Sequence, residues 1–374
     1  MYLQDKKIAI VCDWIKDWGG AELVLSHLLE IFPQADIYTS VFRQQNNALF
    51  KGRKIVTSFL QKIPLIGKSH KLALALRPLA FESFDLKDYD IVISSASAES
   101  KWVITKPNTL HICYCHTPVR YFWSHYHEYL KMMEFGVLNW IAKFIAPRII
   151  HTLRLWDFIA SKRPDFFIAN SHNVAQRITK YYRRESEVIH PWIQITDYKV
   201  EYEKCDYYLS VGRCIPYKKF DLLVDTFNKN GKELVLVTNT KNKLFWSLQK
   251  KSKENIIWKT DVSKTELAKL YSEAKCFLFP PEEDFGLTPL EAMACGTPVI
   301  AYKKWGALET VIHWETGLFF DNQTITSLQK TIEEFEEMRF DPVTIRNHAK
   351  MFDVRNFKEK IGEFIEKKYR EIQK

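Results

Sequence analysis

Short apolar runs typical of β-strands alternate with amphipathic helical patterns along most of this 374-residue chain. The predicted strands cover residues 7–12, 91–94, 110–115 and 166–169 in the first half, and 207–211, 234–237, 276–279, 299–302 and 318–320 in the second. Alternation of this kind requires parallel strands that are joined by crossover helices. The predicted fold class is therefore α/β, with a parallel sheet in each half of the chain.

The length fits two domains at roughly 100–200 residues each. An irregular, Pro-containing stretch at 191–206 interrupts the alternation, so we predict a first domain at 1–192 and a second at 193–355. The remaining segment, 356–374, has apolar residues at helical spacing. An amphipathic helix must pack on something, and the first domain is one surface to which it can cross back.

Composition excludes several classes of protein. Hydrophobic residues make up 46% of the chain and aromatic residues 14%, which is enough for large cores and excludes disorder as the main state. The apolar run at 8–12 is shorter than a signal-peptide core, and no run reaches the ~18–20 residues of a membrane span. We therefore expect a cytoplasmic protein, either soluble or peripheral on the inner face of the membrane, whose seven cysteines are mostly buried thiols.

The positive charge is concentrated in the first half of the chain. Residues 1–190 carry 25 basic and 17 acidic side chains (+8), whereas residues 191–374 carry 29 and 28 (+1). The stretch 51–71 mixes six basic residues with apolar ones and has no acidic residue. Such a mixture suits an anionic bilayer surface, although a solvated loop with buried anchors explains it equally well.

An aromatic helical stretch at 131–156 is expected to pack in the core, with an interfacial helix as the alternative. No nucleic-acid-binding signature accompanies the charge.

Glycine is scarce, with 12 in the chain, so its clusters are informative. Gly19 and Gly20 follow the first predicted strand and precede an apolar helix, but they lack the dinucleotide-binding Gly-x-Gly-x-x-Gly pattern. Without Cβ atoms the backbone can approach a ligand closely, beside a helix N-terminus that attracts anions. A tight strand-to-helix turn without a ligand is the alternative explanation.

Two cations follow the first strand of the second half. Arg213 and Lys218 come directly after the strand 207–211, at the sheet edge where ligands of open α/β sheets bind. A guanidinium fork and an ammonium together are what a diphosphate needs where no metal neutralises it. Taken alone, the pair is better explained as two solvated cations on a loop.

Two glutamates flank a further helix start. Glu283 lies on the loop after the strand 276–279, and Glu291 follows eight residues later, with Gly286 between them. Thr288 as N-cap, Pro289 as first helical residue and Glu291 predict a capping box, which is a structural explanation for Glu291. Capping does not explain Glu283. A sugar diphosphate bound with its phosphate on the helix end would explain both carboxylates.

Together these segments make the chain similar to family 4 retaining glycosyltransferases of the GT-B architecture. The resemblance covers nearly the whole length. It is carried by the motifs at Gly19 to Glu22, Tyr89 to Ser95, Cys113 to Tyr121, Ala169 to Ser171, Gly212 to Lys218, Glu283 to Glu291 and Thr316 to Leu318. The His116-Thr-Pro-x-Arg-Tyr version further resembles bacterial mannosyltransferases of surface-polysaccharide assembly. The resemblance implies two facing Rossmann-like domains, the first for the acceptor and the second for the donor, with a deep interdomain cleft.

The resemblance also implies roles for individual residues. His116 would lie near the transferred sugar, Arg213 and Lys218 would bind the diphosphate, and Glu283 would bind the sugar hydroxyls, which are the four catalytic assignments. The implied donor-binding residues are Gly20, Gly286, the Leu287 and Thr288 amides, and Glu291, which would hold the ribose. A satisfied strand-end histidine is the alternative for His116. Trp305 stands where the family often has glycine, which puts any carried-over contact at that loop in doubt.

The resulting hypothesis is a retaining hexosyltransferase with GDP-mannose as the first expected donor, a UDP-hexose as the second, and a lipid-linked oligosaccharide as acceptor. We expect no cofactor, no obligatory metal and no nucleic-acid partner. Asp88-Tyr89-Asp90 superficially resembles a metal site, but it is better explained as the entry to the strand 91–94. A GT-B epimerase and a non-catalytic nucleotide-sugar or membrane-binding protein remain as alternatives. A dehydrogenase would need the missing glycines.

Overall fold

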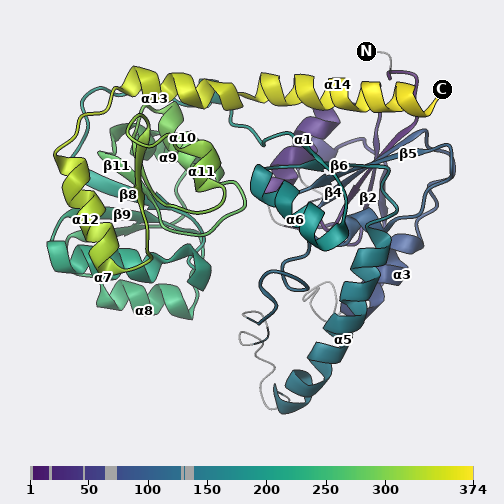
Figure 1. Cartoon of the computed structure of the whole chain (residues 1–374), viewed down its shortest axis with the longest axis horizontal. Helices are drawn as coiled ribbons and strands as arrows, with labels where there is room; N and C mark the ends of the chain where they lie inside the picture. Colours follow the sequence, from purple (N-terminus) through teal and green to yellow (C-terminus); the bar gives the residue numbers. More distant parts are fainter. Residues whose placement is uncertain are drawn as a thin grey trace. The chain divides into compact units, whose positions relative to one another are not determined.

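The computed structural model describes residues 3–16, 19–44, 47–63, 74–127, 130 and 139–373, without side chains at 139–144. The chain forms two compact units, the first comprising Met1–Ile189 with Lys358–Lys374 and the second His190–Phe357 (Figure 1). The change from the first unit to the second at residues 189–190 lies just before the predicted boundary at 192–193.

The first unit contains a seven-stranded parallel sheet in the order β3-β2-β1-β4-β5-β6-β7. Its strands are β1 (Ile8–Cys12), β2 (Asp36–Thr39), β3 (Ile55–Thr57), β4 (Ile91–Ala96), β5 (Leu110–Cys115), β6 (Phe166–Ala169) and β7 (Glu187–Val188). β1, β4 and β5 are buried along their whole length. The crossover helices are α1 (Gly20–Ile31), α3 (Arg77–Glu82), α5 (Asn139–Ala160) and α6 (His172–Tyr182).

The second unit repeats this plan with six parallel strands in the order β10-β9-β8-β11-β12-β13. They are β8 (Tyr207–Val211), β9 (Glu233–Val237), β10 (Ile256–Lys259), β11 (Cys276–Phe279), β12 (Val299–Tyr302) and β13 (Gly317–Phe320). Its helices are α7 (Phe220–Asn230), α8 (Lys243–Lys251), α9 (Lys264–Glu273), α10 (Leu287–Ala294), α11 (Ala307–Thr310), α12 (Ile325–Glu336) and α13 (Pro342–Ala349). Two apolar clusters fill the two faces of this sheet.

The strand orders determine where each sheet can bind a ligand. In the first sheet the order reverses between β1 and β4, and in the second it reverses between β8 and β11. Loops that leave the carboxyl ends of such neighbouring strands diverge to opposite faces and open a crevice. The loops after β1 and β4, and those after β8 and β11, are therefore the places to search for a site.

The last helix, α14 (Val354–Ile372), links the end of the second unit to the first unit. Phe364 packs edge-to-face on Phe166, with ring centroids 6.4 Å apart, and the Lys6 ammonium lies 5.4 Å from the Tyr369 ring centroid. Lys358 pairs with Glu30 of α1. The apolar face that was visible in the sequence is thus covered by the first unit.

The strands absent from the prediction are the short or half-exposed ones. β3 is three residues long and only partly buried, and β7 is a two-residue edge strand. β10 is another edge strand, and it buries only Ile256 fully. All seven cysteines are free thiols, and all except Cys205 are buried. Within the part of the chain that is described, no helix is both long and apolar enough to cross a bilayer.

Candidate active site

Three predicted residues meet at the switch point of the second sheet. Arg213 and Lys218 lie on the loop that leaves β8, and Glu283 lies on the loop that leaves β11. The Lys218 ammonium forms an ion pair with Oε1 of Glu283, and the two side chains are 13% and 18% exposed. Since residues 65 positions apart are paired here, the sheet order itself assembles this part of the site.

The loop after β8 holds its two cations differently. A Cβ atom built on Gly212 would lie 3.5 Å from the Lys218 side chain, so this side chain runs closely over the glycine backbone. Arg213 is exposed, and its Nη2 donates to the Tyr217 hydroxyl at 3.3 Å. The exposed Arg213 guanidinium therefore stands beside the Lys218–Glu283 ion pair, where it is available to an anionic ligand.

Gly286 is required by its backbone and by its surroundings. It has a φ of 94°, and a Cβ atom would lie 2.8 Å from the Phe279 ring, which a real side chain could not tolerate. This turn places the start of α10 at Leu287, with Gly286 as N-cap and no side-chain cap. The predicted capping box is wrong, because Thr288 already lies inside the first turn and cannot serve as N-cap. The first amides of α10, including those of Leu287 and Thr288, are thus left without a side-chain cap.

Glu291 instead lies against two tyrosines. The Tyr271 hydroxyl donates to Oε2 of Glu291 at 2.7 Å, and the Tyr198 hydroxyl is close enough to lower the pKa of the same carboxylate. Burial raises the pKa of Glu291, while both hydroxyls act in the opposite direction. Neither tyrosine is marked in the sequence, since nothing in their local pattern distinguishes them from core residues.

The loop after β12 is fixed against the same site. Gly306 donates its N–H to the carbonyl of Glu283 at 3.0 Å, and a Cβ atom there would lie 2.3 Å from the Phe285 backbone. Only glycine fits this contact. The neighbouring Trp305 has a left-handed φ of 53°, an unusual conformation for a bulky residue. The departure from the family pattern at Trp305 thus lies directly beside the loop that carries Glu283.

His116 lies at the carboxyl end of β5 in the first unit. Its Nε2 is 2.8 Å from the Ser95 hydroxyl, and its ring packs edge-to-face on Tyr114. Because the imidazole has the Ser95 hydroxyl as a hydrogen-bond partner, the structure agrees with the alternative of a hydrogen-bonded histidine at a strand end. The catalytic role of His116 stays a prediction. The predicted residues are therefore divided between the units, with His116 and Gly20 in the first and the others in the second.

The glycine pair after β1 is not required by the turn. Gly19 has a φ of −152°, Gly20 begins α1, and neither has a left-handed φ. A Cβ atom on Gly20 would meet nothing within 4 Å. Next to this turn, at the β1–β4 switch point, a cavity of about 40 Å³ is lined by Asp13, Glu22, Ser95 and Ser97, among others. The alternative of a turn without a ligand therefore does not explain why Gly20 is glycine.

Asp13, at the end of β1, holds the turn after β4. Its carboxylate accepts the backbone N–H groups of Ser97, Ala98 and Ser100 at 2.6–2.8 Å. Burial and the nearby Glu99 raise the pKa of Asp13 to about 6, against the effect of these donors. The predicted strand entry is also seen, because Asp90 accepts the Lys7 N–H at 2.9 Å immediately before β4.

A second buried network lies in the first unit and had no sequence signal. The Lys101 ammonium is 2.7 Å from Oδ1 of Asp157, and both side chains are essentially buried. Trp102, Trp123 and Tyr182 also donate to Asp157 at 2.8–2.9 Å. A buried ion pair with this many partners fixes α5 and α6 to the segment after β4.

Comparisons with known protein families account for most of the chain. Residues 18–197 match the Glycosyltransferase Family 4 domain, and residues 195–352 match the domain named Glycosyl transferases group 1. The two matches meet at 195–197, which is the region where the sequence analysis predicted the seam.

Among curated relatives, the O-antigen chain mannosyltransferase RfbU of Salmonella typhimurium is 28% identical over 219 residues, which are 54% of this chain and 60% of RfbU. The alpha-1,3/1,6-mannosyltransferase ALG2 of Dictyostelium discoideum is 28% identical over 185 residues, 42% of this chain and 41% of ALG2. The matches thus span less than two thirds of either relative.

A solved structure shows the same fold over a longer range. HepE of Anabaena, crystallised with UDP, superposes with a TM-score of 0.70 at 18% identity, covering 96% of this chain and all of HepE. This likeness supports the fold, with its two parallel-sheet units, independently of any residue assignment.

Proposed function

Because the chain belongs to the family 4 glycosyltransferases and has the GT-B fold, we propose that it is a retaining hexosyltransferase of bacterial surface-polysaccharide biosynthesis. It transfers a hexose from a nucleoside diphosphate sugar to a hydroxyl group of a lipid-linked oligosaccharide. The observation that best supports this proposal is the meeting of Arg213, Lys218 and Glu283 beside the uncapped start of α10.

The ion pair between Lys218 and Glu283 gives the proposal a mechanism. When a diphosphate arrives, the Lys218 ammonium turns to it, and the Glu283 carboxylate is released to accept hydroxyl groups of the sugar. Arg213 and the first amides of α10 share the phosphate charge. As the bond from the sugar C1 to the diphosphate breaks, these donors stabilise the negative charge that grows on the leaving group.

Transfer then occurs on the face that the diphosphate leaves. The acceptor oxygen forms its bond to C1 on that face, and its proton passes to an oxygen of the departing phosphate, so configuration is retained. In this proposal Glu291 binds the ribose, His116 contacts the transferred sugar, and Gly20 leaves room for acceptor or phosphate. The route requires no divalent metal, since Arg213 and Lys218 supply the positive charge.

GDP-mannose is the first donor in this proposal, because two relatives are named as mannosyltransferases. A UDP-hexose is the second, because HepE was crystallised with UDP. A thermal-shift screen with GDP, UDP, ADP and their sugars distinguishes the two, since the preferred nucleotide stabilises the fold by mass action. If none of these nucleotides raised the melting temperature, the result would contradict the proposed donor site.

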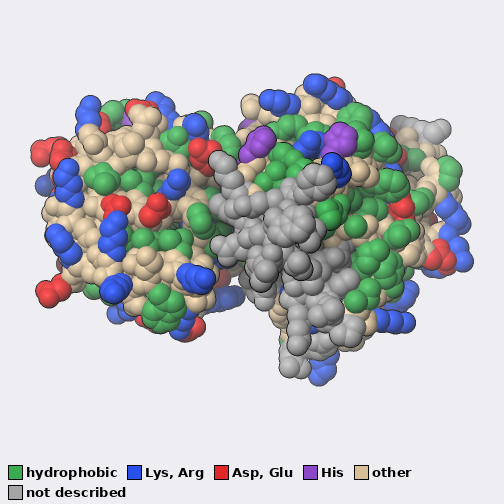
Figure 2. All heavy atoms as spheres, turned by 90° about the horizontal axis from the view of Figure 1, so that it is seen from below, with side chains coloured by type: hydrophobic (Ala, Val, Ile, Leu, Met, Phe, Trp, Pro, Cys, Tyr) green, Lys and Arg blue, Asp and Glu red, His purple; other side chains and the backbone are tan. Residues whose placement is uncertain are grey.

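The acceptor is proposed to be held at an anionic membrane. The outer face of α5 exposes Ile145, Leu155, Phe158 and Ile159, which are 36–60% exposed. Arg148 and His151 are exposed on the same helix, whose one acidic residue, Asp157, is buried. Figure 2 shows hydrophobic side chains close to Lys and Arg side chains on the surface of the first unit. Residues 64–71 of the basic stretch 51–71, and residues 131–138, lie outside the described residues.

A transfer assay tests the enzyme itself. Incubation with GDP-mannose and a lipid-linked oligosaccharide should give a glycosylated lipid with unchanged anomeric configuration, at equal rate in EDTA. Conversion of the donor without an acceptor would indicate the epimerase instead. Binding without any turnover would indicate the non-catalytic alternative, and loss of activity in EDTA with recovery on adding magnesium or manganese would overturn metal independence.

A further inference from the structure

Two tyrosines converge on Glu291 from separate segments of the second unit. Tyr271 belongs to α9, Tyr198 follows the short helix Ile195–Asp197, and Glu291 belongs to α10. The two rings pack edge-to-face with centroids 6.3 Å apart. Both hydroxyls therefore reach one carboxylate from neighbouring rings, although 73 residues separate them in the sequence.

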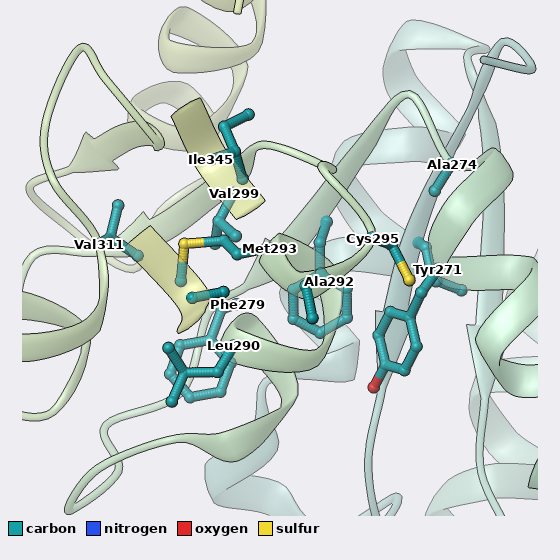
Figure 3. Close-up of a cluster of buried hydrophobic side chains, with 14 of the residues drawn as sticks. Tyr271, Ala274, Phe279, Leu290, Ala292, Met293, Cys295, Val299, Val311 and Ile345 are labelled. Carbon is teal, nitrogen blue, oxygen red and sulfur yellow. The ribbon is translucent and has the colours of Figure 1, made fainter. Parts of the chain in front are cut away.

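Packing fixes both tyrosines in place. Tyr271 is completely buried, and its carbonyl accepts the Thr297 hydroxyl at 2.6 Å. Figure 3 shows its ring beside Ala292 and Cys295, with the hydroxyl pointing away from Ala274. The carbonyl of Tyr198 accepts Nη1 of Arg346 at 2.9 Å. The two hydroxyl donors are thus held by the core and by an arginine, and not by Glu291 alone.

The buried hydroxyl of Tyr271 does not need a carboxylate as its hydrogen-bond acceptor. Tyr207 buries its hydroxyl in the same unit and donates to a backbone carbonyl, that of Leu270, at 2.8 Å. Even a half-buried carboxylate costs more to desolvate than a carbonyl, and among the described residues no cation pairs with Glu291. This cost is explained if the carboxylate has another partner to bind.

A carboxylate has room for such a partner. Its two oxygens can accept about four hydrogen bonds, of which Tyr271 supplies one at 2.7 Å and Tyr198 at most a second. The remaining capacity matches the two hydroxyl groups of a ribose. Because both tyrosine hydroxyls favour the ionised form, they also oppose the effect of burial on the pKa of Glu291.

We infer that Tyr198 and Tyr271 are positioning residues, which hold Glu291 ionised and oriented so that it recognises the ribose hydroxyls of the donor nucleotide. This inference rests on the proposed function and adds to it the way in which the site distinguishes a ribonucleotide from a deoxyribonucleotide.

The test compares the affinities of the full-length protein for GDP, 2′-deoxy-GDP and 3′-deoxy-GDP by calorimetry, with the corresponding uridine nucleotides as a second set. We expect the wild-type protein to bind the ribonucleotide at least about tenfold more tightly than the analogue that lacks the contacted hydroxyl. Tyr271→Phe and Tyr198→Phe should each reduce this ratio to about threefold or less, while kcat at saturating donor changes little.

A pH series gives a second readout that a merely structural role would not change. Loss of a hydroxyl donor raises the pKa of Glu291 further. As the pH is lowered, Glu291 should therefore become protonated, and ribose discrimination should disappear, at a higher pH in Tyr271→Phe than in the wild type. Tyr207→Phe is the matched control, because it removes a buried hydroxyl of the same unit that does not contact Glu291. It should leave the ratio and its pH dependence unchanged.

Different outcomes separate this inference from the proposed function. If Glu291→Gln abolishes discrimination while both tyrosine variants keep the wild-type ratio, the positioning role is overturned and the ribose role survives. If Glu291→Gln keeps the ratio, the ribose role of Glu291 and the inference both fail, whereas the transfer assay still tests the enzyme. If Tyr271→Phe does not fold, Tyr198→Phe decides the question.

Discussion

Lys218 is the residue at which the proposed chemistry can be tested most directly. Replacing it by alanine removes one charge-assisted contact to the diphosphate and leaves Glu283 without its cation. We expect the transfer rate to fall by about 30–1,000-fold, which corresponds to roughly 2–4 kcal/mol of transition-state stabilisation. Steady-state kinetics with saturating acceptor measures this change. Arg213→Ala should show a loss in the same range.

Lys229→Ala is the matched control for this experiment. Lys229 is exposed in the last turn of α7 in the same unit, away from the loops after β8 and β11. Circular dichroism should show that all three variants are folded. Near-wild-type transfer by a folded Lys218→Ala protein would refute the assignment of the phosphate site.

At the residue scale, the side chains that could be predicted from the sequence are those that follow the ends of predicted strands. Arg213, Lys218 and Glu283 could be placed at one sheet edge because the strands before them were visible as apolar runs. Tyr271 could not be found, since its role arises only when α9 and α10 pack together. The predicted capping box failed because Gly286, with its left-handed φ, is the N-cap of α10, two residues before the predicted N-cap Thr288.

At the element scale, β5 carries a buried group that makes the first unit sensitive to acid. His111 is fully buried in this strand, with its Nε2 3.0 Å from the Ser94 hydroxyl. Burial, and secondarily the charge of Arg163, lowers the pKa of His111 to about 3. The folded protein therefore keeps His111 neutral, while an unfolded chain takes up a proton near pH 6.5.

The sign of the resulting pH dependence follows from linkage. Between pH 6.5 and about 3 the unfolded state binds more protons than the folded state, so stability falls as the pH falls through this window. His111 alone should contribute a loss of about 2 kcal/mol between pH 7 and pH 5, which the raised pKa of Asp13, about 6, opposes in part. His111→Gln should remove most of that loss, as measured by hydrogen exchange of the β4 and β5 amides.

His151→Gln serves as the comparison for His111, because His151 is exposed on α5 in the same unit. It should leave the pH dependence of exchange as it is in the wild type. Equal sensitivity of wild type and His111→Gln between pH 7 and pH 5 would show that His111 is not the group responsible.

Helices and strands differ in how well the sequence specified them. Strands buried on both faces, such as β5 and β11, were predicted with their observed bounds because every residue is apolar or tolerates burial. β2 and β10 were missed, since β2 begins with Asp36 and ends with Thr39, and β10 lies half-exposed at a sheet edge. Their pairing with neighbouring strands, rather than their local pattern, makes them strands.

At the scale of the whole molecule, the two-unit plan could be predicted from the alternation of strands and helices, whereas the crossing of α14 back to the first unit could be named only as one way to bury its apolar face. The helix leaves the second unit and packs its apolar face on the first through contacts such as Phe364 with Phe166. Amphipathic spacing shows that a helix has a buried face, but does not identify the surface that buries it.

The same limit applies to the outer face of α5, whose apolar residues stay 36–60% exposed in the described chain. If this face contacts an anionic bilayer, replacing Leu155 and Ile159 together by serine should weaken vesicle binding by about tenfold or more. Sedimentation with vesicles of neutral lipid, with and without phosphatidylserine, measures the change, and binding of the wild type should weaken as salt is added. Trp246→Ser, at an exposed apolar side chain of the second unit, is the control. Full binding by the double-serine protein would exclude this face, and a wild-type protein that dimerises through α5 without binding vesicles would assign it to self-association.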